Sequence, residues 1–111
     1  MTGEPTLFDD DRPPYALDEI GQRFWTFHLA HPFVYEALVR LALDWQETGH
    51  GRCGMKMLWE RLRWELLTSS DFATLGQRPA LDNRHTSRYA RLLMDDARFR
   101  GLFETRALRA A

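Results

Sequence analysis

The stretch RHTSRYARLLMDD (84–96) decides the predicted fold, because it has the periodicity of an amphipathic helix and carries several arginines. At about 100° per residue, its long polar side chains fall within one arc of roughly 100°. Its apolar side chains fall on the other side, where a core can bury them. The polar set is Arg84, Ser87, Arg88 and Arg91, and the apolar set is Tyr89, Ala90, Leu93 and Met94.

Three further helices are predicted before this stretch, over residues 17–29, 32–48 and 55–67, because apolar residues recur there at steps of three and four. Pro32 suits the first position of the second of these helices, and Gly49 suits the residue after its end. We therefore expect a mainly α, small helical domain of helix-turn-helix or winged-helix type, with at most a short β-hairpin. The link before the last helix is long for a simple helix-turn-helix, which favours the winged variant.

The domain organisation follows from composition and charge. Residues 1–14 contain prolines and the acidic run Asp9, Asp10 and Asp11, so we expect a flexible acidic arm followed by one domain over 15–111. The net charge of −1 over 111 residues hides an uneven distribution. The first fifty residues contain three arginines and nine acids, whereas the rest contains twelve basic residues and seven acids. This asymmetry suggests an anionic partner for the basic half.

Several function classes are not favoured by this sequence. It contains no apolar run of the roughly 18 residues that a membrane helix needs, so no membrane association is expected. One cysteine excludes an internal disulfide framework and indicates a reducing, cytoplasmic location. No phosphate loop or nucleophile motif is present, and we therefore expect a protein that is not an enzyme and needs no cofactor.

The leading functional hypothesis is contact with double-stranded DNA through the helix over 84–96. An α-helix fits the major groove of B-DNA, and arginine can donate two hydrogen bonds to guanine. Its N-terminal end also favours phosphate. The alternative is a solvated surface in which Arg91 pairs with Asp95. The predicted nucleic-acid contacts are Asn83, Arg84, Ser87, Arg88 and Arg91.

The alternative function is that of a protein-binding module, such as an inhibitor of another protein. Met57 and Trp64 fall on the face of the helix over 55–67 that is opposite its main apolar face. Such a second apolar patch is usually covered. The cover is either the segment Phe72 to Leu81 or a partner protein. The acidic run Asp9, Asp10 and Asp11 is a second candidate contact for a partner.

A less favoured hypothesis is a structural zinc site. The pattern His28, His31, His50 and Cys53 has ligand types and pair spacings that zinc accepts. However, a chain with four Trp and seven Phe has enough apolar residues to build a core without a metal. We therefore interpret these histidines mainly as residues that flank helix ends, and Cys53 as an unreactive thiol.

Four stretches together resemble a known group of sequences. They are AHPFVYEALVRLA (30–42), GMKMLWERLRWEL (54–66), SRYARLLM (87–94) and GLFETRALR (101–109). They resemble a small uncharacterised family from phage, prophage and bacterial genomes. The resemblance implies a mostly helical, winged-helix-like protein of mobile elements, whose genes often encode DNA-binding regulators or inhibitors of a host protein. The family carries no activity that can be transferred, so no functional residue is taken from it.

Overall fold

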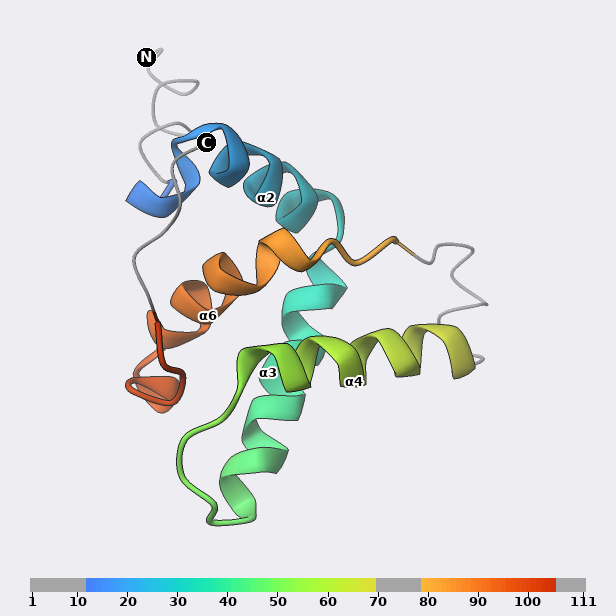
Figure 1. Ribbon diagram of the computed structural model, residues 1–111, viewed down its shortest axis with the longest axis vertical. Helices are drawn as coiled ribbons and strands as arrows, with labels where there is room; N and C mark the ends of the chain where they lie inside the picture. Colours follow the sequence, from blue (N-terminus) through green and yellow to red (C-terminus); the bar gives the residue numbers. More distant parts are fainter. Residues whose placement is uncertain (1–11, 70–78, 106–111) are drawn as a thin grey trace, which may run out of the picture.

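The computed structural model describes residues 12–69 and 79–105, and this part of the chain is mainly helical, as predicted (Figure 1). The described elements are four α-helices and three short 3-10 helices. In chain order they are η1 (Pro14–Ala16), α2 (Glu19–Ala30), α3 (Pro32–Glu47), α4 (Met55–Thr68), η2 (Asn83–His85), α6 (Thr86–Met94) and η3 (Ala97–Phe99).

Local signals in the sequence explain where α2 and α3 begin and end. The Asp18 carboxylate accepts a hydrogen bond of 2.7 Å from the Gly21 backbone N–H and so caps α2. Leu17, the first residue of the helix predicted over 17–29, precedes the cap instead and is half exposed. Pro32 opens α3 as predicted, and Gly49 follows its end with a φ of +76°.

The predicted last helix is shorter and less regular than expected. Residues 83–85 form the 3-10 helix η2, and the α-helix α6 begins only at Thr86. Asp82 caps η2, because its carboxylate accepts a hydrogen bond of 2.8 Å from the Arg84 backbone N–H. The chain leaves α6 at Asp95, and η3 follows after a second capping aspartate, Asp96.

Pairing of β type is limited to one bridge within the described residues. Cys53 lies beside Phe103 in parallel orientation, and the Cys53 N–H donates to the Leu102 carbonyl at 2.9 Å. The described residues contain no strand, so the winged-helix type stays a prediction. Most of the long link before the last helix, which favoured the winged variant, lies within residues 70–78, outside the described part of the chain.

The core is built around α6, which lies between α2 and α4 (Figure 1). Tyr89 of α6 is fully buried, with its ring edge-on to Phe24 of α2 at 4.8 Å and tilted against Trp59 of α4 at 5.5 Å. Such aromatic contacts add to the free energy that apolar burial already provides. Because α6 has a neighbouring helix on two sides, only a narrow strip of its surface can reach an external partner.

Candidate functional site

Arg88 is the central residue of the predicted DNA-contacting set, and the structure buries it. Its side chain is 4% exposed, and Nη2 lies 3.1 Å from each carboxylate oxygen of Asp18. Nε donates to the Tyr15 carbonyl at 2.9 Å. The prediction that Arg88 projects from the surface is therefore wrong. A charged side chain is usually exposed, but a guanidinium that is paired with a carboxylate and hydrogen-bonded can be buried. Here Tyr15 of η1 and Asp18, the N-cap of α2, supply the acceptors.

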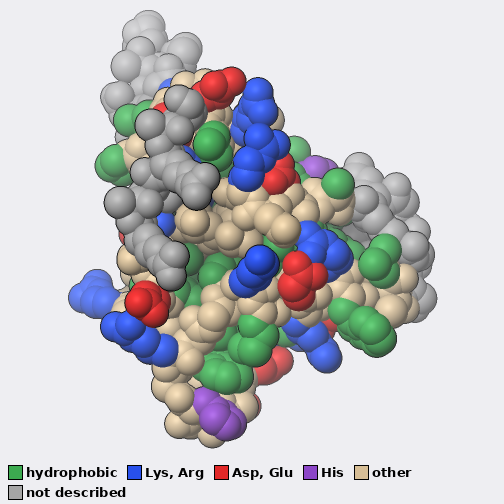
Figure 2. All heavy atoms as spheres, viewed as in Figure 1, with side chains coloured by type: hydrophobic (Ala, Val, Ile, Leu, Met, Phe, Trp, Pro, Cys, Tyr) green, Lys and Arg blue, Asp and Glu red, His purple; other side chains and the backbone are tan. Residues whose placement is uncertain are grey.

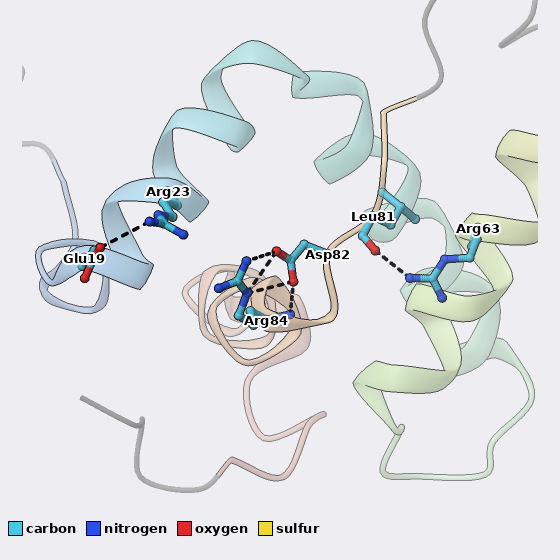
Figure 3. Close-up of polar contacts among 6 residues, drawn as sticks. All are labelled: Glu19, Arg23, Arg63, Leu81, Asp82 and Arg84. Carbon is cyan, nitrogen blue, oxygen red and sulfur yellow. Dashed lines mark hydrogen bonds and ion pairs between the residues drawn. The ribbon is translucent and has the colours of Figure 1, made fainter. Parts of the chain in front are cut away.

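Arg84 is exposed but is held by Asp82 (Figure 3). Its Nη2 lies 2.7 Å from Asp82 Oδ2 and its Nε lies 3.2 Å from Asp82 Oδ1, in the two-pronged geometry that arginine forms with carboxylates. Hydrogen bonds from the Arg84 side chain and backbone lower the pKa of Asp82 to about 2. The same arrangement recurs between Asp96 and Arg98. Arg84 would have to break its ion pair with Asp82 before its guanidinium could contact DNA.

The other predicted contacts also have partners inside the molecule. Asn83 Oδ1 accepts from Arg63 Nη2 at 3.0 Å, and the same nitrogen donates to the Leu81 carbonyl at 2.7 Å, a contact drawn in Figure 3. Arg91 Nη1 donates to the Ser87 carbonyl at 3.0 Å. The five predicted residues therefore do not form one exposed row.

The expected partner of Arg91 is also occupied elsewhere. Asp95, which the solvated-surface alternative paired with Arg91, accepts a hydrogen bond from the Tyr15 hydroxyl at 2.8 Å. Burial and the neighbouring Arg88 lower the pKa of Arg91. The Arg91 guanidinium is therefore partly buried and lies near Arg88, rather than on an open helical surface.

The most exposed apolar surface lies on α4. Met57, Trp64 and Leu67 are 46%, 63% and 65% exposed, and we call these three side chains the α4 outer face. Met57 and Trp64 lie about 20° apart around the helix, opposite the buried Trp59 and Leu62. In Figure 2, hydrophobic side chains lie over α4 among charged ones. Leu67 was not among the predicted partner-binding residues. Its position about one helical turn after Trp64 could have indicated that it lies on the same side of the helix.

Every carboxylate of α4 is paired with a guanidinium. Glu60 forms an ion pair with Arg63. Glu65 is shared between Arg61 of the same helix, at 3.3 Å, and Arg40 of α3, at 2.5 Å. A partner can therefore cover the α4 outer face without leaving one of these carboxylates buried and unpaired, which would be costly.

The four zinc candidates are not brought together. The His28 ring stacks with Phe24 and the His31 ring lies near Phe27, both on α2, with centroids 6.1 and 4.8 Å apart. His50 instead stacks on Trp45 at the far end of α3, at 5.2 Å. The described residues, which include all four candidates, contain no group of three or more metal-ligating side chains. The zinc hypothesis is therefore wrong for this set of residues.

Two other sequence candidates fall wholly or partly outside the described residues. Asp9, Asp10 and Asp11 lie outside the described residues, and so does most of the segment Phe72 to Leu81. The described end of that segment does contact α4, because Leu81 is buried and its carbonyl accepts from Arg63.

Comparison with known proteins adds no relative: no family model, no curated protein and no solved structure matches this chain. The resemblance to a phage and bacterial family therefore stays a prediction. Among the described helices, none has the length and apolar character required to cross a membrane.

Proposed function

We propose that this protein is a non-catalytic protein-binding module that docks through the α4 outer face. The observation that carries the proposal is the exposure of Met57 and Trp64 on one side of α4. Arg88 of α6, by contrast, is buried and forms an ion pair with Asp18. Sequence reasoning offered these two surfaces as alternatives. The apolar one is open in the structure, and the arginine one is largely occupied by intramolecular partners.

The apolar area at Trp64 is large enough to matter for binding. A whole Trp side chain offers about 250 Å², so an exposed fraction of 63% leaves roughly 150 Å² for a partner to cover. At about 25 cal/mol per Å², this burial contributes up to about 4 kcal/mol. Trp is also the residue type most often found at energetic hot spots of interfaces.

The spacing of the exposed side chains suggests the shape of the partner surface. Met57 and Trp64 are two helical turns apart, which is about 10.5 Å along the axis. A helix of a partner protein that lies along α4 and carries apolar residues at the same spacing would cover both. The paired charges beside them make this contact depend mainly on apolar burial rather than on charge.

Affinity capture with surface variants tests this proposal. Wild-type protein and the variants Trp64→Ser, Met57→Ser and Arg84→Gln are used as baits in lysate of the source cell, and each captured protein is purified and titrated. The expected partner binds wild type and Arg84→Gln equally and binds Trp64→Ser at least about thirtyfold more weakly. A partner that binds all four baits equally would overturn the assignment to α4.

Sedimentation of the purified protein tests whether a second copy of this chain, rather than a different protein, covers the α4 outer face. Concentration-dependent dimerisation that disappears in Trp64→Ser would mean that the α4 outer face binds a second copy of this chain. That result would contradict the proposal that the α4 outer face binds a different protein. A monomer at all concentrations supports the proposal.

A further inference from the structure

Two histidines lie where α2 contacts η2 and α6, and both pack against the same aromatic ring. His28 of α2 stacks on Phe24, and His85 of η2 is tilted against Phe24, each with ring centroids 6.1 Å apart. His28 also lies edge-on to Tyr89 of α6 at 5.8 Å, and His85 lies 5.0 Å from Phe27. We call His28 and His85 the two interface histidines. A proton on either ring would place a positive charge in a contact built mainly from apolar rings.

Hydrogen bonding does not explain why these two positions carry imidazoles. The Nδ1 atom of each ring is buried and has no hydrogen-bond partner among the described residues. His85 is only 6% exposed. A buried polar atom without a partner costs free energy, and a Phe ring would fill a similar space without that cost. The property that distinguishes His from Phe here is that an imidazole titrates in the range of about pH 5 to 8.

The charged groups around His85 do not compensate a proton on its ring. Arg84 and Arg88 oppose a positive charge there, whereas Asp82 favours one. Burial has the largest effect, and it lowers the pKa of His85 below the ordinary value of 6.5. On the α2 side, the titratable residues that line the groove beside His85 are His31 and an ion pair formed by Glu19 and Arg23. His85 is therefore neutral in the closed contact near pH 7.

His28 lies on a helix that tolerates protonation of this side chain. Burial lowers the pKa of His28 as well, and the titratable side chains that its ring contacts are Tyr35 of α3 and Tyr89 of α6. His28 also lies in the last turn of α2, where the helix dipole favours a cation once the ring reaches water. Protonation should therefore weaken the contacts of this end of α2 while α2 itself stays helical.

We infer that the contact between α2 and η2 is a pH-sensitive switch, closed while His28 and His85 are neutral and released when they are protonated. The opposite end of α2 stays in place, because Asp18 remains bound to Arg88. Release removes His85 from Phe24 and Phe27 and widens the groove of about 560 Å³ that Phe27 and His85 line. Mild acid therefore uncovers an apolar surface that is closed at neutral pH.

A pH titration of the whole chain followed by NMR tests this inference. The released state binds protons more readily than the closed state, so its population should rise as the pH falls below 6.5. At pH 5.0 the rise should reach up to about thirtyfold for each interface histidine, since 1.5 pH units below 6.5 is a factor of about thirty. Relaxation dispersion of the backbone amides of residues 82–86 measures the released population. The far-UV circular dichroism should stay constant, because α2 remains helical.

Three variants separate the switch from a general effect of acid. His85→Phe keeps an aromatic ring but cannot be protonated, so it should stay closed at pH 5.0 and be at least as stable as wild type at pH 7.5. His28→Phe should lose its own share of the response, a decrease of up to about thirtyfold at pH 5.0. The matched control is His50→Phe, because His50 is exposed and stacks on Trp45 at the far end of α3, and it should respond like wild type.

Three results would overturn the switch. The first is a released population in wild type that does not change between pH 7.5 and 5.0. The second is a response of His85→Phe and His28→Phe equal to that of wild type. The third is a loss of helical signal together with the contact, which would mean that acid unfolds the whole domain instead of releasing η2.

Discussion

Replacing Arg88 by Ala should destabilise the fold far more than replacing Arg84 by Ala, although both are arginines of the same predicted surface. Arg88→Ala removes hydrogen bonds to both Asp18 oxygens and to the Tyr15 carbonyl. Removing one partner of a buried ion pair costs about 3–5 kcal/mol. The side chain of Asp18 is 38% exposed and can partly rehydrate, so we expect a loss of about 2–3 kcal/mol.

Arg84→Ala is the matched control, because it breaks an exposed ion pair with Asp82, and such pairs contribute little to stability. The free energies of unfolding are measured by urea denaturation followed by circular dichroism. A second variant, Asp18→Asn, keeps an acceptor for the Gly21 N–H but leaves the Arg88 cation without its carboxylate, and should also lose stability. If Arg88→Ala and Arg84→Ala have the same midpoint and slope in urea, the buried position of Arg88 is refuted.

Three further predictions concern other parts of the fold. Gly21→Ala should cost about 1–3 kcal/mol in urea denaturation because its Cβ would lie 2.3 Å from the Tyr15 carbonyl oxygen, whereas Gly54→Ala, with open space around it, should change stability little. Burial lowers the pKa of His85 below its ordinary value of 6.5, so the unfolded state binds the proton more readily. Stability should be complete above pH 6.5 and fall as the pH drops below it, with a shallower fall in His85→Gln; equal slopes in the two proteins would contradict this. Burial raises the pKa of the Cys53 thiol to about 11, so iodoacetamide at pH 8 should label the native protein about a hundredfold more slowly than the unfolded protein, and equal rates would contradict the burial.

The helices could be predicted from the sequence because their signals are local. The three- and four-residue periodicity of α2, α3 and α4, together with Pro32 and Gly49, placed their ends within about two residues. The last helix was predicted over 84–96 and is two residues shorter at each end. At its start, Asp82 can cap either an α-helix or a 3-10 helix, and residues 83–85 take the second form. The position of Met57 and Trp64 opposite the buried face of α4 was predicted correctly, because it follows from the helical period alone. Their exposure was not predicted, because the sequence favoured a cover over this second apolar patch.

The direction of each polar side chain was decided only by the tertiary structure. A helical wheel sorts residues by type into two faces, but α6 is covered by α2 on one side and by α4 on another. Arg88 therefore points to Asp18, a residue 70 positions earlier in the chain, and no local pattern could reveal that partner. The sequence by itself determined which segments become helices. The packing of those helices determined which arginines bind the protein itself, because Arg88 meets Asp18 only when α6 lies against the N-terminal end of α2.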